Sequence, residues 1–234
     1  MSRNVIKGLL RISSVLALVL SLSTGLVVPA FSETIVLRSG GGIALLSPDP
    51  NWTYLAGSPV IPLSAVPFTA ADFAAALSGP SAIVVPPYGS AWLPSLVCDP
   101  LAQWISVSTS WGPASTLFAR DFDVTTCCIV KATLTFCWAA DDYLGDAAAG
   151  GANPSGVYLN QAPLPIDGGN YATEFSSTVD VTSLVHCGLN ELHVYDRDGA
   201  AVVSGAMFNA TLEITGCPLA TERATWSKIK ALYR

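Results

Sequence analysis

Two stretches of this chain alternate between apolar and polar residues, and this alternation constrains the fold more than any other feature. In the first, one face carries Val130, Ala132, Leu134, Phe136 and Trp138, and the other carries Lys131, Thr133 and Thr135. In the second, Ala206, Phe208, Ala210, Leu212 and Ile214 lie opposite Asn209, Thr211, Glu213 and Thr215. A period of two is typical of a β-strand with one buried and one solvated face. The sequence therefore predicts an all-β fold, an antiparallel β-sandwich.

Turn residues bound further apolar runs on both sides of these stretches. We predict strands at Thr34–Leu37, Trp52–Ala56, Ala82–Val85, Gln103–Ser108, Thr116–Phe122, Ile129–Trp138, Val157–Asn160, Ala172–Val181, Glu191–Asp196 and Ala206–Thr215. Nine prolines between residues 48 and 94 exclude long helices there. One short helix is predicted at Thr69–Leu77, because Thr69 can cap it and Asp72 occupies its third position.

The first 32 residues have the pattern of a secretory signal peptide. Arg3, Lys7 and Arg11 precede a mostly apolar stretch at 12–28, and Ala30-Phe31-Ser32 predicts cleavage after Ser32. The alternative is a retained membrane anchor, but serines and glycine dilute the segment below a good spanning helix. No later apolar run is long enough to cross a bilayer, so the mature chain is predicted to have no transmembrane segment. We expect a secreted, extracellular or cell-surface protein with a single domain at 33–217.

The charges are unevenly distributed along the mature chain. Residues 33–217 carry four basic side chains against 16 acidic ones, a net charge of −12. Such a surface repels phosphate, which argues against nucleic-acid binding. Residues 218–234 form a basic tail with a net charge of +3. Its apolar residues Trp226, Ile229, Leu232 and Tyr233 suit a short amphipathic helix or a docking peptide for a sorting partner. The alternative is a terminus that folds back on the acidic domain.

Several segments in order resemble the secreted jelly-roll domains of the galactose-binding-like superfamily. The resemblance covers about 49–217 and rests on Asp49–Trp52, Gln103–Ser106, Phe118–Phe122, Ala132–Asp142, Val157–Asn160, Asp180–Leu184 and Gly188–Leu192. The sequence departs from the family pattern in its cysteines and in a proline-rich stretch at 57–97. The resemblance implies a jelly-roll topology.

The resemblance also implies a ligand site at one end of the sandwich or on a strand face. The candidate ligand-binding residues are Asp141, Asp142, Tyr143, Tyr158, Asn160 and Arg197. Asp196 and Asp198 are candidate calcium ligands, because their carboxylates fall on alternate residues. Carboxylates, amides and aromatic rings suit a glycan. We expect Asp141, Asp142, Asn160 and Asp198 to cluster. The alternative is that these residues only close turns, Asn160 in a hairpin next to Gln161.

Six cysteines in an exported chain favour disulfides over metal ligands, and the residues alone permit 15 pairings. They are Cys98, Cys127, Cys128, Cys137, Cys187 and Cys217. The jelly-roll resemblance implies a Cys98–Cys217 disulfide and pairs Cys187 with Cys127 or Cys128. Cys137, expected on the solvated face, then takes the remaining vicinal cysteine or stays free.

The sequence offers little for catalysis. It has no Gly-x-Ser-x-Gly motif and no phosphate-binding loop. Adjacent aspartates such as Asp141 and Asp142 rarely span the distance that a glycosidase needs. We therefore predict a non-catalytic module that binds a glycan or cell-surface polysaccharide, with calcium as a stabilising ion. The alternative is a structural or adhesive surface domain without a small ligand.

Overall fold

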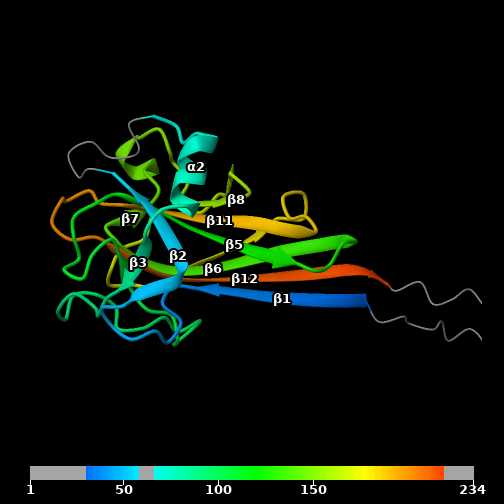
Figure 1. The fold of residues 1–234 in the computed structure, drawn as a ribbon, viewed down its shortest axis with the longest axis horizontal. Coiled ribbons are helices and arrows are strands. Elements are labelled where there is room, and N and C mark those ends of the chain that lie inside the picture. The colour runs from blue at the N-terminus through cyan, green and yellow to red at the C-terminus, as the bar shows by residue number, and fades with distance from the viewer. Residues whose placement is uncertain (1–29, 58–65, 219–234) are drawn as a thin grey trace, which may run out of the picture. The chain divides into compact units, whose positions relative to one another are not determined.

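Twelve antiparallel strands form one strongly curled sheet in the computed structural model, which describes residues 30–57 and 66–218 (Figure 1). The strands are β1 (Ala30–Arg38), β2 (Pro48–Ala56), β3 (Ser81–Val84), β4 (Ile105–Ser106), β5 (Thr116–Val124), β6 (Ile129–Asp141), β7 (Tyr143–Leu144), β8 (Val157–Leu159), β9 (Ala162–Pro163), β10 (Phe175–Asp180), β11 (Gly188–Arg197) and β12 (Gly205–Pro218). Their order is β10-β6-β12-β4-β3-β2-β5-β11-β8-β9, while β1 pairs with β12 and β7 with β11. The predicted all-β antiparallel fold is confirmed. The basic tail from residue 219 and the signal peptide up to residue 29 lie outside the described residues.

The two alternating stretches form the longest strands, β6 and β12, and these pair with each other. The register runs from Asp141 opposite Gly205 to Ile129 opposite Gly216. The predicted apolar faces of both strands are buried, including Trp138. Val130 is the exception, because it lies near the start of β6 and is 58% exposed.

The sheet curls until its two halves pack face to face. Phe208 on β12 meets Trp52 on β2 edge-on, with ring centroids 4.7 Å apart, and lies 6.4 Å from Phe118 on β5. Strands β4 and β3 separate β12 from β2 in the sheet order, so these contacts cross the interior. The curled sheet therefore encloses one main core like a sandwich, within a compact unit that spans Phe31–Cys217.

A second apolar cluster covers part of the outer face of β6 and β12. Cys137, Ala139 and Met207 pack there against Trp92, Trp104 and other side chains of the segment before β4. Cys137 is therefore buried, and the prediction that it lies on a solvated face is wrong. Alternation indicated the side of the strand correctly but did not reveal that the 85–104 segment covers it.

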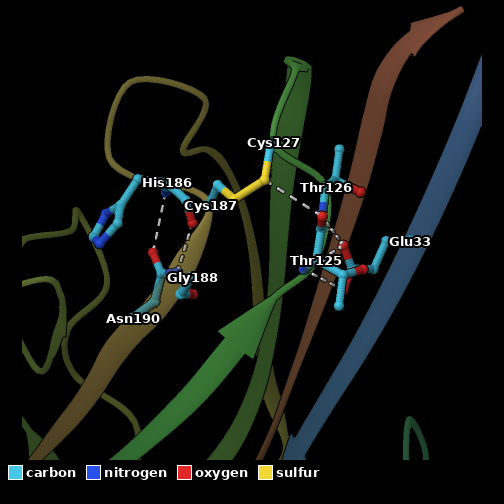
Figure 2. Close-up of a disulfide and its surroundings, with 8 residues drawn as sticks. All are labelled: Glu33, Thr125, Thr126, Cys127, His186, Cys187, Gly188 and Asn190. Carbon is cyan, nitrogen blue, oxygen red and sulfur yellow. Dashed lines mark hydrogen bonds between the residues drawn. A yellow bond between two sulfur atoms is a disulfide. The ribbon is translucent and has the colours of Figure 1, made fainter. Parts of the chain in front are cut away.

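Two disulfides join strand ends that are distant in the sequence. Cys127, in the turn between β5 and β6, bonds to Cys187 just before β11 (Figure 2). Cys128 bonds to Cys217 at the end of β12. The expected Cys98–Cys217 pairing is therefore wrong, while a partner for Cys187 among the vicinal cysteines is confirmed. Cys98 and Cys137 are not bonded to another cysteine in the structure.

The same end of the sheet is fixed by hydrogen bonds around the first disulfide (Figure 2). The Glu33 carboxylate of β1 accepts hydrogen bonds from the backbone N–H groups of Thr125 and Thr126 at 2.9–3.1 Å. The Asn190 side chain bonds the backbone of His186 and Gly188. These contacts hold the turn after β5 and the start of β11 in place.

One short helix, α2 (Ala70–Leu77), packs against β2 and β5 of the sheet (Figure 1). Thr69 and Asp72 form the predicted capping box. The helix buries Phe73 and Ala76 against β5, β8 and β11. Among the described residues, no helix is long and apolar enough to cross a membrane.

Candidate functional site

Four aspartates meet where β6 and β11 end, and we call them the acidic cluster: Asp141, Asp142, Asp196 and Asp198. Asp141 ends β6, and Asp196 lies near the end of β11 opposite Leu144 of β7. Asp141, Asp196 and Asp198 are at most 5% exposed. The structure therefore brings together the predicted residues from the 141–142 and 196–198 segments.

Two carboxylate oxygens of the acidic cluster are buried without a hydrogen-bond partner. Asp196 Oδ2 accepts from the Ser204 hydroxyl at 3.0 Å, but Asp196 Oδ1 has no partner. Asp198 Oδ1 accepts from the Ala201 N–H at 2.6 Å, and its Oδ2 is left without one. An unmatched buried carboxylate oxygen is costly unless a proton or a cation satisfies it.

Burial and mutual repulsion disfavour the ionised form of the acidic cluster. Burial, followed by the charges of Asp142 and Asp198, raises the pKa of Asp141 to about 7. Burial raises the pKa of Asp196 well above its ordinary value, although the Ser204 hydrogen bond opposes this. The pKa of Asp198 is also raised by burial. Without a cation, the cluster therefore holds protons at pH values where aspartate is normally ionised.

The donor chemistry of the acidic cluster suits a hard cation such as calcium, which takes carboxylate and carbonyl oxygens. Asp196 Oδ1 and Asp198 Oδ2 are the oxygens free to bind it. Among the described residues, however, the acidic cluster does not place donor atoms of three side chains within 4.8 Å of one another. A bound calcium ion would therefore need backbone carbonyls or water besides two of these carboxylates.

A pocket with aromatic walls lies between α2 and the loop that follows the acidic cluster. It has a volume of about 270 Å³ and is lined by Pro67, Phe68, Phe73, Ala152, Asn153, Pro154, Ser155, Tyr158, Gln161 and Pro163. We call it the aromatic pocket. The ring of Phe68 packs edge-on against Phe73 and Tyr158, with centroids 5.8 and 5.7 Å apart. Phe73 and Tyr158 are nearly buried, whereas Phe68 is partly exposed at the wall.

Asn153 joins the loop after β7 to the segment that precedes α2. Its Oδ1 accepts from the Phe68 N–H at 2.8 Å, and its Nδ2 donates to Val66 O at 2.9 Å. Asp146 closes the same loop, because its Oδ2 accepts from the Asn153 N–H at 3.2 Å. The side chain of Asn153 is thus used in shaping the wall, and Ser155 and Gln161 are the polar side chains left to meet a ligand.

Three other predicted site residues, Tyr143, Arg197 and Tyr158, divide between these two places. Tyr143 pairs with Arg197 at the acidic cluster, in the β7–β11 register. Burial lowers the pKa of Arg197, but the Tyr195 hydrogen bond and electrostatic interactions with Tyr195, Tyr143 and Asp146 raise it overall. Tyr158 belongs to the aromatic pocket instead.

Asn160 does not join the acidic cluster, contrary to expectation. It follows β8, which pairs with the middle of β11, and its amide bonds Leu184 O, Asn190 Oδ1 and the Glu191 N–H at 2.8 Å each. Asn160 and Gln161 both have positive φ, at 50° and 68°, as a tight hairpin turn requires. The turn-closing alternative for Asn160 is the one that the structure supports.

Sequence reasoning missed Phe68 and a polar groove on the outer face of β2, β5 and β11. The groove has a volume of about 190 Å³ and is lined by Pro50, Asn51, Thr53, Leu77, Ala119, Arg120, Asp121, Leu189 and Glu191. Burial lowers the pKa of Arg120, while Asp49 and Asp121 oppose this. Alternation along β5 places residues 119 and 121 on one face, but the partner strands that complete the groove were not predictable.

Comparisons with known proteins show remote likeness only. No protein-family model matches the chain, and no curated protein is significantly similar to it. The Stig cyclase Fisc from Fischerella sp. TAU, solved in complex with (3Z)-3-(1-methyl-2-pyrrolidinylidene)-3H-indole, is 13% identical with a TM-score of 0.37. The match covers 81% of this chain and 100% of the cyclase chain.

The isomaltodextranase of Arthrobacter globiformis T6, solved in complex with panose, is 11% identical with a TM-score of 0.26. The match covers 79% of this chain and 32% of the enzyme chain, so this chain corresponds to about a third of that protein. Neither likeness assigns a function to this chain.

Proposed function

We propose that this domain is a non-catalytic module that binds one sugar unit of a glycan in the aromatic pocket. The observation that supports the proposal is a pocket of about 270 Å³ that combines an aromatic wall with polar side chains. This volume is just below the range of about 300–1,000 Å³ that is common for drug-sized ligands, which favours a single ring.

The chemistry of the walls suits a pyranose. The C–H face of a sugar packs on an aromatic ring, here the partly exposed Phe68, and Ser155 and Gln161 can hydrogen-bond hydroxyl groups. The rings of Phe73 and Tyr158 pack edge-on against Phe68 and restrict its orientation. The wall is therefore pre-organised, which lowers the entropic cost of binding.

Calcium is the second part of this proposal, as a structural ion at the acidic cluster. Asp196 and Asp198 would hold it through their unpartnered oxygens, and its charge would relieve the repulsion among the four aspartates. The loop that begins at the acidic cluster also carries Asn153, so an ion there would stiffen the wall of the aromatic pocket.

Glycan-array screening followed by calorimetry on the best glycan tests the proposal. We expect Phe68→Ala to weaken binding about tenfold or more, because it removes the exposed part of the aromatic wall. Gln161→Asn should weaken binding while keeping the fold, because asparagine tolerates the positive φ at this position. Calcium chelation should weaken binding by loosening the loop.

Tyr171→Ala is the matched control, since Tyr171 is 38% exposed and lies outside the pocket lining. It should leave affinity unchanged. Loss of binding in Arg120→Ala, with Phe68→Ala unaffected, would instead place the ligand in the polar groove. A folded domain that binds no glycan on the array would favour the structural or adhesive alternative.

A further inference from the structure

The two free cysteines lie next to each other, although the structure assigns them no bond. The Sγ atoms of Cys98 and Cys137 and a carboxylate oxygen of Glu174 all lie within 4.8 Å of one another. Cys137 is on β6 and buried, whereas Cys98 is exposed at the end of the 85–98 segment. Among the described residues, this is the one group of three potential metal ligands whose donor atoms lie so close together.

The approach of Cys98 to β6 is held by Glu174, which immediately precedes β10. Its carboxylate accepts hydrogen bonds from the backbone N–H groups of Val97 and Cys98, the latter at 3.1 Å. Leu96, two residues before Cys98, is buried in the second apolar cluster with Trp92 and Trp104. The position of the Cys98 thiol is thus set by contacts that do not involve sulfur.

We infer that Cys98 and Cys137 form a third disulfide in the exported protein, which fastens the 85–98 segment to β6. A disulfide has an S–S distance of about 2.05 Å, so the sulfurs need to approach by at most roughly 3 Å. The exposed position of Cys98 allows that movement. The other four cysteines are already paired, so this bond would leave the chain without a free thiol.

The bond forms by thiol–disulfide exchange with an external disulfide donor, such as oxidised glutathione or a disulfide oxidoreductase. The Cys98 thiolate attacks one donor sulfur, which releases one donor thiolate and leaves a mixed disulfide. The Cys137 thiolate then attacks Cys98 Sγ and expels the second donor thiolate. The two cysteine protons go to the two donor thiolates, and the donor takes up the two electrons. Cys98 reacts first because Cys137 is buried.

The surroundings make the first step slow at neutral pH. Burial raises the pKa of the Cys98 thiol, and the neighbouring Cys137 thiol and Glu174 carboxylate raise it further. The fraction of thiolate, and with it the rate of exchange, therefore increases by up to about tenfold per pH unit below the pKa. Burial, Cys137 and Glu174 all raise the pKa, so none of them lowers this barrier.

A disulfide is favoured over a bound metal ion by the chemistry of the three groups. Cys98, Cys137 and Glu174 supply only three ligands, whereas structural zinc sites are usually closed by four. Glu174 is also engaged by two backbone N–H groups. The other four cysteines of the chain form disulfides and hold no metal, which favours the same chemistry for Cys98 and Cys137.

Peptide mapping tests the inference. The full exported chain is denatured in the presence of iodoacetamide, which alkylates free thiols, and is digested without reductant. We expect no alkylated cysteine and a peptide pair joined through Cys98 and Cys137. The double variant Cys98→Ala/Cys137→Ala should keep the other two disulfides and melt about 5–10 °C lower, because the 85–98 segment is no longer fastened. Alkylation of both Cys98 and Cys137, with the other four cysteines paired, would overturn the inference.

Glu174→Gln separates the disulfide from a metal site. The variant removes a metal ligand and a negative charge. When the protein is reduced, desalted and treated with oxidised glutathione, the Cys98–Cys137 disulfide should form about threefold faster than in the wild type. Loss of the neighbouring negative charge lowers the pKa of the Cys98 thiol and increases its thiolate fraction, and the lower nucleophilicity of the weaker base offsets part of this gain. One equivalent of zinc in the purified protein, lost in Glu174→Gln together with protection from alkylation, would identify a metal site instead.

Discussion

Replacing Phe208 with alanine is expected to lower the free energy of unfolding by about 3–5 kcal/mol, as measured by urea denaturation. Phe208 is fully buried and contacts Trp52 at 4.7 Å and Phe136 at 5.7 Å, measured between ring centroids. These rings come from β2, β6 and β12, on both sides of the curled sheet. The substitution therefore removes contacts that join the two halves, and the cavity cannot collapse without moving both.

Two controls define this prediction. Val202→Ala, at a side chain that is 64% exposed, should change stability by less than about 0.5 kcal/mol. Phe208→Leu keeps most of the volume and should cost about 1–1.5 kcal/mol. A Phe208→Ala variant as stable as the Val202→Ala control would contradict the enclosed core.

The strands with clear alternation were predictable because one side of each packs on the core. β6 and β12 lie close to their predicted bounds, and α2 begins at its predicted cap. Alternation cannot reveal a second layer on the opposite side, which is why Cys137 was misplaced. The covering side chains come from the 85–104 segment, whose prolines give no periodic pattern.

The disulfides and the site depended on strand pairing, which sequence patterns do not specify. β6 and β12 pair along their whole length, so Cys217 reaches the start of β6, where its N–H donates to Cys128 O at 2.8 Å. Cys98 lies outside the sheet, in the segment between β3 and β4, and its sulfur is next to Cys137 in the later half of β6. The acidic cluster was predictable in part, because Asp141 ends the long strand β6 and Asp198 directly follows the long strand β11. Asn160 was misplaced because β8 pairs with the middle of β11, away from Asp196.

In the presence of a chelator, the contribution of Asp141 to the stability of the domain is expected to be lost as the pH rises from about 4 to about 7. Burial and the neighbouring aspartates raise the pKa of Asp141 from 3.8 to about 7 in the folded state. Between these values the unfolded chain releases a proton that the folded chain retains, so each pH unit favours unfolding. A pKa difference of about three units, at about 1.4 kcal/mol per unit, limits the loss of unfolding free energy to about 4 kcal/mol. Because solvent screens the charge of the half-buried Asp142, we expect a loss of about 2 kcal/mol.

Asp141→Asn isolates this contribution, because asparagine is neutral at every pH. The variant should match the wild type at pH 4 and exceed it by about 2 kcal/mol at pH 7.5 in chelator. Burial raises the pKa of Glu33, but the hydrogen bonds from Thr125 and Thr126 outweigh it and lower this pKa overall, and burial lowers the pKa of His193 to about 4. Both groups give the opposite pH trend in variant and wild type, so they cancel in the comparison. Equal stability of variant and wild type across this range would mean that Asp141 ionises normally.

Calcium should reverse the trend if the acidic cluster binds it. A bound cation keeps the aspartates ionised, and at 100 times its dissociation constant it adds about 2.7 kcal/mol at neutral pH. Asp196→Asn removes a buried unpartnered oxygen as a ligand and should abolish this gain, whereas Asp123→Asn at an exposed position should retain it. A wild-type domain that shows the pH-dependent loss but no calcium gain would have a proton-holding cluster and no structural ion. In that case the loop beside the aromatic pocket is held without a cation by Asp146, Asn153 and backbone hydrogen bonds, and chelation should not affect glycan binding through it.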